Sequence, residues 1–196
     1  MEKRVIAVFD FDGTLTTKDT MLEFIRFVCG TKKLYLGILL YSPLLVLMKM
    51  RVIDNHKLKQ RFLSYFFKGL TYSEFSEYGM SFASREAELL NRGTHAMLLK
   101  HLQEGADVYV VSASVVEWVR PFCLSLGVKE VLGTEMEVDA DGKLTGRFAT
   151  HNCYGKEKVR RFLEVEPDRD SYTLYAYGDS RGDYPMFELS DYHRKV

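Results

Sequence analysis

The chain has 196 residues with 27 basic and 27 acidic side chains, so its formal net charge at neutral pH is zero. This balance excludes the basic footprint of a nucleic-acid-binding protein. A hydrophobic share of 46% is that of an ordinary globular protein, and the length allows one core with a sizeable insertion. Cys29, Cys123 and Cys153 are scattered and indicate neither a disulfide framework nor a zinc site. With no signal-peptide pattern at the start, we expect a cytoplasmic protein.

The first predicted element is a strand over residues 5–9 that ends at two acidic residues. The run is apolar at consecutive positions, which is typical of a buried parallel strand. It stops at Asp10-Phe-Asp12-Gly13-Thr14, and ligands of open α/β sheets bind beyond such strand ends. Two carboxylates facing one site repel each other unless a cation lies beside them, and Mg²⁺ prefers carboxylate oxygens. The same four-residue pattern also occurs in solvated turns.

A helical pattern follows Thr14 and continues for much of the first half of the chain. Asp19 or Thr20 can cap the first of these helices, and Gly30 can end it. Thr71 and Glu74 match a capping box. The predicted helices cover residues 21–29, 34–51 in two pieces around Pro43, 56–67 and 71–91. An all-helical block directly after the first strand predicts a cap domain over residues 16–91, with residues 1–15 and 92–196 forming the α/β core.

Residues 34–48 are apolar almost throughout. The segment is shorter than the roughly 20 residues that a spanning helix needs, and Pro43 interrupts it. We therefore predict a buried or partner-facing helix of the cap. Contact with a membrane surface is the alternative that the segment leaves open, and it is not favoured.

The α/β pattern resumes after the cap. We predict helices over residues 94–103, 115–126 and 156–164, core strands over 107–112 and 171–177, and a hairpin formed by 131–138 and 143–149. The second core strand ends at Ser112, and the third runs into Gly178-Asp179-Ser180-Arg181-Gly182-Asp183. Because parallel strands end at one edge of a sheet, we expect these residues to meet Asp10 and Asp12 in a single site.

These residues together resemble the four motifs of the haloacid dehalogenase-like phosphatases, which are Asp10-x-Asp12-Gly13-Thr14, Ser112, a lysine near 156, and Gly178-Asp179-Ser180-x-x-Asp183. The helical insertion is similar to that of the phosphoserine phosphatase-like subfamily IB. The resemblance implies a Rossmann-like, three-layer core with a parallel sheet, an inserted all-helical C1 cap and a small β-hairpin. It also implies a hydrolase that needs Mg²⁺.

The resemblance further assigns roles to individual residues. Asp10 would be the nucleophile, and Asp12 would move a proton to and from the reacting oxygens. Mg²⁺ would be held by Asp10, the backbone carbonyl of Asp12, and Asp179, with Asp183 in the outer shell. The phosphate would be bound by Ser112, by the backbone N–H of Ala113 as a donor at a helix start, and by Gly13.

Two lysines compete for the role of the catalytic cation. The segment Gly155-Lys156-Glu157-Lys158 carries both, and the phosphoserine phosphatase pattern favours Lys156, with Lys158 as the alternative. Two further residues are candidates for substrate selection. Asp19 stands where phosphoserine phosphatases carry a glutamate, and Arg61 resembles their carboxylate-binding arginine, although it can equally be an exposed helix charge.

The leading functional hypothesis is a Mg²⁺-dependent phosphatase that acts through an aspartyl-phosphate on a small phosphorylated metabolite. The acid at Asp12 favours phosphoester hydrolysis, since an alkoxide leaving group must be protonated. The first alternative is a membrane-associated phosphatase of lipid phosphates, of the phosphatidylglycerophosphate type. The second is a non-catalytic phosphate-binding module, against which Asp10 and Asp12 argue. The sequence identifies neither the physiological substrate nor the oligomeric state.

Overall fold

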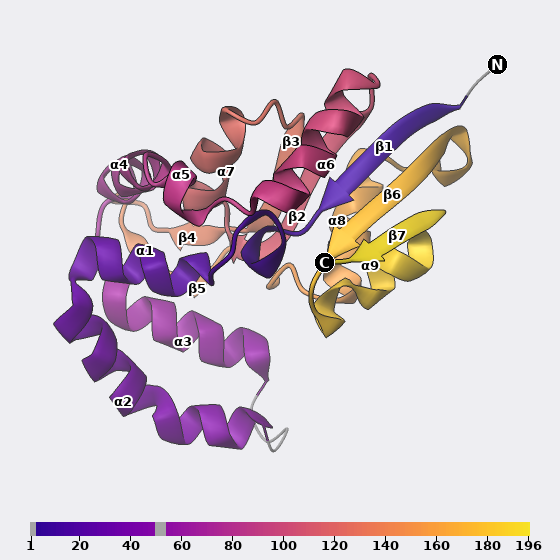
Figure 1. The fold of residues 1–196 in the computed structure, drawn as a ribbon. Coiled ribbons are helices and arrows are strands. Elements are labelled where there is room, and N and C mark those ends of the chain that lie inside the picture. The colour runs from indigo at the N-terminus through magenta and orange to yellow at the C-terminus, as the bar shows by residue number, and fades with distance from the viewer. Residues whose placement is uncertain (1–2, 50–53) are drawn as a thin grey trace.

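The core of the computed structural model is a five-stranded parallel sheet with strand order β3-β2-β1-β6-β7 (Figure 1). The structure describes residues 3–49 and 54–196, without the side chains of residues 45–49. The strands of the sheet are β1 (Arg4–Phe9), β2 (Asp107–Val115), β3 (Glu130–Thr134), β6 (Tyr172–Gly178) and β7 (Tyr192–Lys195). A separate antiparallel hairpin consists of β4 (Met136–Val138) and β5 (Leu144–Phe148). The expected fold class, with its parallel sheet, helical insertion and hairpin, is confirmed.

Helices cover both faces of the sheet. The helices of the core are α6 (Arg92–Gln103), α7 (Val116–Leu124), α8 (Lys156–Val165) and α9 (Tyr184–Leu189). Side chains of β1 alternate between the two layers, because successive residues of a strand point to opposite faces. Ile6 and Val8 pack with α8 and α9, whereas Ala7 and Phe9 pack with α6, α7 and the insertion.

The insertion between β1 and α6 contains five described helices, α1 (Thr20–Cys29), α2 (Thr31–Lys49), α3 (Asn55–Phe67), α4 (Tyr72–Ala83) and α5 (Glu86–Leu89). Asp19 caps α1 by accepting a hydrogen bond from the backbone N–H of Leu22, and Gly30 ends the helix. Thr71 and Glu74 form the expected capping box at the start of α4. The predicted helix over 71–91 is two helices, α4 and α5, separated by a turn.

Helix α2 runs through Pro43 without the break that the proline suggested. A proline has no N–H to donate to the carbonyl four residues earlier, which here belongs to Leu39. The hydroxyl of Ser42 donates to that carbonyl instead, at 2.8 Å, and so replaces the missing donor. The predicted end of this helix at Arg51 lies outside the described residues. No helix within residues 3–49 and 54–196 combines the length and the apolar composition needed to cross a membrane.

The two ends of the insertion lie side by side. Thr16 and Leu90 form an antiparallel bridge, and the N–H of Asn91 donates to the carbonyl of Leu15. Between these ends, the insertion shares one apolar cluster with the core: the ring of Phe24 in α1 stacks on Trp118 in α7, with centroids 4.7 Å apart. The division into a cap over 16–91 and a two-part core remains a proposal, which the paired ends support.

The predicted hairpin over 131–149 is shorter than expected. Its first half is β3, which pairs with β2 and extends the main sheet, and only β4 pairs with β5. The run 130–138 contains two strands because it changes direction after Thr134. Helix α9 and strand β7 are further elements that the sequence pattern did not indicate.

Candidate active site

Three parallel strands bring the predicted residues to one edge of the sheet. In the register of the sheet, Phe9 of β1 lies between Val110 of β2 and Tyr177 of β6. Asp10, one residue beyond Phe9, therefore lies near Ser112 and Asp179, and its N–H donates to the carbonyl of Tyr177 at 2.9 Å. A cavity of about 350 Å³ opens at this point, and we call it the polar cavity. Its lining includes Asp10, Asp12, Gly13, Ser112, Ala113, Lys158 and Asp179.

Of the two candidate lysines, Lys158 lies in the site. Its ammonium group is 2.7 Å from Asp10 Oδ1 and 2.6 Å from Asp183 Oδ1, and its side chain is only 4% exposed. Lys156, two residues earlier, is the first residue of α8 and is exposed. Residues two apart on a helix point about 200° apart, so only one of the pair can face the sheet. The geometry favours Lys158 over the preferred Lys156, and the assignment of its role belongs to the proposal below.

Burial and charge act in opposite directions on this pair. Burial raises the pKa of Asp10, and Lys158 opposes that rise. For Lys158, burial lowers the pKa, but the charges of Asp10 and Asp183 outweigh it, so its pKa lies above the usual range. Lys158 therefore carries a fixed positive charge beside Asp10 at neutral pH.

A cluster of carboxylates surrounds this lysine. Among the described residues, Asp10, Asp179 and Asp183 each offer an oxygen within 4.8 Å of the others. Asp183 is held in place because the N–H and hydroxyl of Ser180 donate to its Oδ2 at 3.0 and 2.9 Å. Burial and the charge of Asp183 raise the pKa of Asp179. The cluster is a set of hard oxygen donors close enough together to bind one small divalent cation.

Gly13 allows the carboxylate cluster to lie close to the turn that follows β1. It lies in the wide turn Phe11–Leu15 with φ of +74°, where glycine is favoured. A Cβ at this position would lie 2.5 Å from Oδ2 of Asp179. The glycine therefore leaves room for the carboxylate of Asp179 directly beside the turn.

Asp12 is held by hydrogen bonds from the insertion and from β2. One of its oxygens accepts hydrogen bonds from the N–H and hydroxyl of Thr20, at 2.7 and 2.6 Å. Its other oxygen accepts from the hydroxyl of Ser114. The carboxylate of Asp12 is thus oriented by neutral donors, and Asp10 by a cation, although the two acids are only two residues apart.

Ser112 and Ala113 lie where the sequence placed them, but not at a helix start. Strand β2 continues through Val115, and the following helix begins at Val116. The hydroxyl of Ser112 accepts a hydrogen bond from the N–H of Ser114 at 3.0 Å. Both Ser112 and Ala113 line the polar cavity, from the last part of a strand and not from the first turn of a helix.

The residues expected to select the substrate separate in space. Asp19 lines the polar cavity, whereas Arg61 is exposed and lines a different cleft with Lys68 and Lys143. Lys59, on the opposite face of α3 from Arg61, reaches the site instead. Its ammonium group donates to the carbonyl of Ala113 at 2.9 Å. Burial lowers the pKa of Lys59, and nearby carboxylates oppose that effect.

Sequence reasoning missed Lys59, although a signal was present. Leu58, Phe62, Leu63 and Phe66 form the buried stripe of α3, and Lys59 falls within that stripe by helical spacing. A charged residue on an otherwise buried face is a better candidate for function than one on the exposed face.

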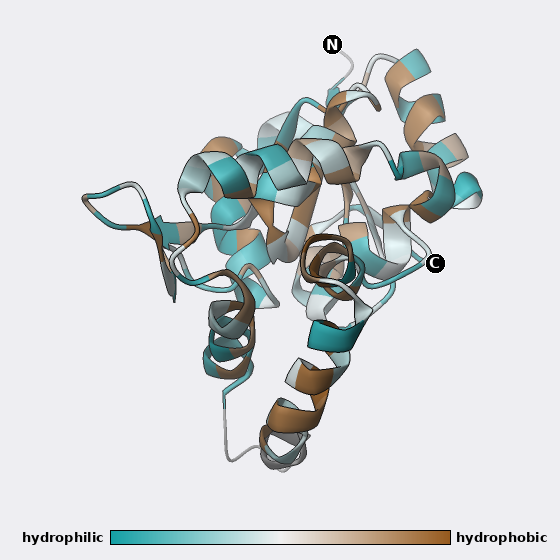
Figure 2. Cartoon of the chain, turned by 90° about the vertical axis from the view of Figure 1, so that its left-hand side faces the viewer, coloured by the Kyte–Doolittle hydropathy of each residue, from teal (hydrophilic) through white to brown (hydrophobic). Residues whose placement is uncertain are grey.

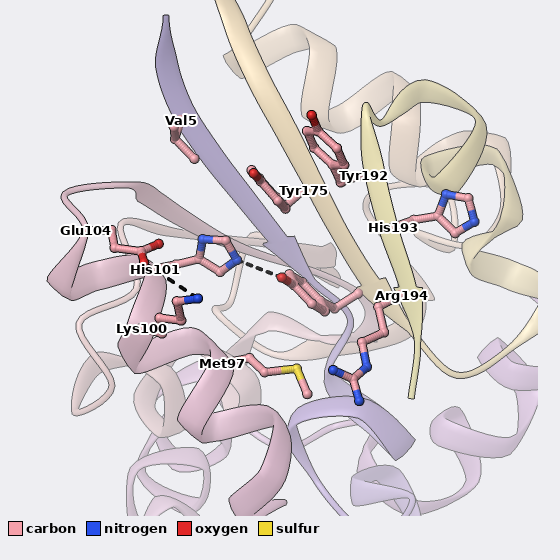
Figure 3. Close-up of a pocket in the computed structure, with 10 residues that line it drawn as sticks. Val5, Met97, Lys100, His101, Glu104, Tyr175, Tyr192, His193 and Arg194 are labelled. Carbon is pink, nitrogen blue, oxygen red and sulfur yellow. Dashed lines mark hydrogen bonds and ion pairs between the residues drawn. The ribbon is translucent and has the colours of Figure 1, made fainter. Parts of the chain in front are cut away.

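A separate cavity of about 510 Å³ lies between α6 and the β6–β7 edge (Figure 3). Within it, Nε2 of His101 and the hydroxyl of Tyr177 are 2.7 Å apart. The ring of Tyr177 stacks on Phe9 with centroids 4.4 Å apart, directly before Asp10 in the chain. None of the three carboxylates of the cluster lines this cavity, so we do not regard it as the reaction site. Its residues His101 and Tyr177 instead pack against the end of β1, next to Asp10.

Comparison with known proteins agrees with the class that this fold and site define. The family model of the haloacid dehalogenase-like hydrolases matches residues 7–188. The chain belongs to this family, and the expectation of an enzyme is confirmed.

The chain is similar to individual proteins in sequence and in structure. The chain is 34% identical to protein CicA of Caulobacter vibrioides over 190 residues, which are 95% of this chain and 83% of that protein. It is 26% identical to a phosphoserine phosphatase of Mycobacterium tuberculosis, over 93% of this chain and 61% of that protein. A protein of unknown function from Bordetella pertussis has the same fold, with a TM-score of 0.84 and 20% identity over 97% of this chain and 89% of its own. A substrate-bound phosphoserine phosphatase also shares the fold, with a TM-score of 0.65 and 18% identity over 98% of this chain and 86% of its own.

Proposed function

We propose that the protein is a Mg²⁺-dependent phosphomonoester phosphatase that forms an aspartyl-phosphate on Asp10. The observation that carries the proposal is the contrast between the two acids. Asp10 is buried beside the cation of Lys158, whereas Asp12 is oriented by neutral donors, Thr20 of α1 and Ser114 of β2. The similarity to a phosphoserine phosphatase supports a phosphorylated substrate.

The reaction divides into two steps in which Asp10 and Asp12 keep separate roles. In the first step, an oxygen of Asp10 attacks phosphorus, the bond from phosphorus to the leaving oxygen breaks, and Asp12 gives that oxygen its proton. In the second step, Asp12 takes a proton from water as the water oxygen attacks phosphorus. The bond to Asp10 then breaks, and inorganic phosphate is released. Lys158 offsets the negative charge that gathers around Asp10 in both steps.

The donor set fits a magnesium ion. Asp10, Asp179 and Asp183 supply carboxylate oxygens within 4.8 Å of one another, and Mg²⁺ favours such hard donors. Asp10, Asp179 and the backbone carbonyl of Asp12 would hold the ion, with Asp183 in its outer shell. When bound, the ion would lower the repulsion between the phosphate dianion and the carboxylates. Membership of a family that is typically Mg²⁺-dependent supports the same cofactor.

The proposal is tested by hydrolysis of p-nitrophenyl phosphate with Mg²⁺. Asp10→Asn removes the nucleophile and is expected to abolish turnover with little effect on the fold. Asp141→Asn makes the same chemical change on the exposed loop of the hairpin and is expected to leave turnover unchanged. EDTA should remove the activity and Mg²⁺ should restore it. Retained hydrolysis by the Asp10→Asn variant would refute the assignment of the nucleophile, and metal-independent turnover would refute the cofactor.

A membrane-associated phosphatase of lipid phosphates is the second candidate, and the surface of α2 favours it. Figure 2 shows this helix coloured mostly as hydrophobic beyond its first turn. Tyr35, Leu36, Leu39 and Leu40 are 61%, 49%, 70% and 55% exposed. An exposed apolar row of this kind is typical of a surface that contacts lipid or a partner. Sedimentation with anionic vesicles would test this candidate, and protein that stays in the supernatant would count against it.

A further inference from the structure

A second cavity, of about 410 Å³, adjoins the polar cavity. It lies among α1, α2, α3 and the end of β2, and we call it the apolar cavity. Asp12, Asp19, Lys59 and Ala113 line both cavities. Asp12 is thus at the junction, and a group attached to the oxygen that Asp12 protonates would extend into the apolar cavity.

The walls of the apolar cavity come from three helices of the insertion. Its apolar lining consists of Met21 and Leu22 from α1, Ile38 from α2, and Leu58 and Phe62 from α3. Ligand cavities with walls of this kind bind the apolar part of a ligand by removing it from water. The polar lining residues are Asp12, Asp19, Asn55, Lys59, Ser114 and Asn152, and the hydroxyl of Ser114 is already bonded to Asp12.

The charges that line this cavity disfavour an anionic leaving group. Among its lining residues in the described part of the chain, Lys59 is the only cation, and it faces the carboxylates of Asp12 and Asp19. Its ammonium group is also bonded to the carbonyl of Ala113. A carboxylate on the substrate would therefore meet the like charge of Asp19, and it would share the single cation, Lys59, with that residue.

We propose that the substrate is a phosphomonoester of an alcohol with an uncharged, apolar body, and that this body occupies the apolar cavity. The inference rests on the proposed phosphatase function and adds the chemical class of the leaving group. Met21 and Ile38 are its specificity-determining residues. O-phosphoserine is expected to be a poor substrate, because its zwitterionic serine body has no apolar part to fill this cavity.

The test measures kcat/KM for straight-chain monoalkyl phosphates from ethyl to octyl, below their micelle-forming concentrations, with O-phosphoserine for comparison. Each methylene that leaves water is expected to raise kcat/KM by roughly two- to fourfold until the cavity is filled. Monoalkyl phosphates share the same phosphoryl group, and their leaving groups have similar basicity. The increase of kcat/KM with chain length, the chain-length slope, therefore reports on binding in the cavity and not on the chemical step.

Matched variants locate the effect. Met21→Gln and Ile38→Asn place a polar amide in the wall at two half-buried positions on different helices, and both are expected to flatten the slope. Leu124→Asn makes a comparable change on α7, where the side chain is 72% exposed and lines neither cavity, and is expected to leave the slope unchanged. Thermal unfolding of each variant shows whether it remains folded.

The outcomes separate this inference from the function on which it rests. A flat slope in the wild-type protein, or a preference for O-phosphoserine, would overturn the inference while leaving the phosphatase intact. Absence of turnover with every phosphomonoester, including p-nitrophenyl phosphate, would refute the phosphatase proposal itself. Hydrolysis of phosphatidic acid in vesicles then distinguishes a substrate taken from a bilayer from one that is free in solution. Hydrolysis that is lost with Leu39→Asn indicates a substrate taken from a bilayer, and hydrolysis of soluble alkyl phosphates alone indicates a free amphiphile.

Discussion

Replacing Lys158 by methionine should impair both activity and stability, whereas the same change at Lys156 should have little effect on either. Methionine keeps the length of the chain and removes the ammonium group that lies 2.7 and 2.6 Å from Asp10 and Asp183. The two carboxylates are 10% and 3% exposed, so they would stay buried without a cation. Losing one partner of a buried ion pair costs about 3–5 kcal/mol. Losing a positive group beside developing charge lowers kcat by about 10²–10³-fold.

Activity is measured by p-nitrophenyl phosphate hydrolysis with Mg²⁺. Stability is measured separately by urea unfolding in EDTA, so that no metal ion takes the place of the missing ammonium group. Lys156→Met is the matched control, and a change at this exposed site should alter the free energy of unfolding by less than about 0.5 kcal/mol. In the Lys158→Met variant, the lost stability should recover partly as the pH falls, because protonation removes the charge of the buried carboxyls. If Lys156→Met lowered kcat as much as Lys158→Met, the assignment of the catalytic lysine to position 158 would be wrong.

Three further substitutions test other parts of the structure. Burial raises the pKa of Glu117 in the fold to about 7, so the folded state holds this proton where the unfolded state has lost it, and stability falls as the pH rises from about 4.5 through about 7. Glu117→Gln should remove this pH-dependent loss of stability and raise the free energy of unfolding above pH 7 by up to about 3 kcal/mol. Urea unfolding at several pH values measures it, and a pH dependence equal to that of the wild-type protein would contradict the prediction. Gly13→Ala should cost about 1–3 kcal/mol and lower kcat, because the turn has positive φ and the new Cβ meets Asp179; unchanged kinetics and thermal unfolding would argue against the strain. Tyr177→Phe should cost about 1 kcal/mol in urea unfolding, since His101, whose Nδ1 already has no partner within the described residues, would lose its bond at Nε2.

Strands β1, β2 and β6 of the parallel sheet were predictable because they are largely apolar runs that lead into acids or small residues, whereas β3 was assigned to the hairpin and β7 was not indicated. Errors arose where one run of residues holds two elements. The stretch 130–138 alternates like a single strand but divides between the main sheet and the hairpin. Pro43 suggested a break that the hydroxyl of Ser42 prevents. Neither outcome follows from local pattern, because each depends on which neighbour supplies a hydrogen bond.

The candidate site was predictable to the level of strand ends and not to the level of helix faces. Asp10 and Asp179 follow β1 and β6, and Ser112 lies in the last part of β2; because these strands lie side by side, the convergence of the three residues follows from topology alone. The choices between Lys156 and Lys158, and between Arg61 and Lys59, depend on the angle at which a helix packs on its neighbours. On α3, the apolar stripe indicates that angle and places Lys59 inward. On α8, Phe162 lies four residues after Lys158 and is fully buried, so the same reasoning would have favoured Lys158.

In the proposed reaction, the contrast between Asp10 and Asp12 follows from what each acid would have to do. A nucleophile must stay ionised in a buried place, which requires a nearby positive charge, and Lys158 provides it. An acid that both gives and takes a proton must not be fixed in the ionised form by a cation. Thr20 and Ser114 orient Asp12 with neutral donors, and the nearest cation, Lys59, is shared with Asp19 and bonded to the carbonyl of Ala113. Because Thr20 begins the first helix of the insertion, the insertion positions the proton donor as well as forming the walls of the apolar cavity. A substitution in α1 that shifts Thr20 should therefore reduce kcat for substrates with poor leaving groups more than for p-nitrophenyl phosphate, whose leaving group needs little protonation.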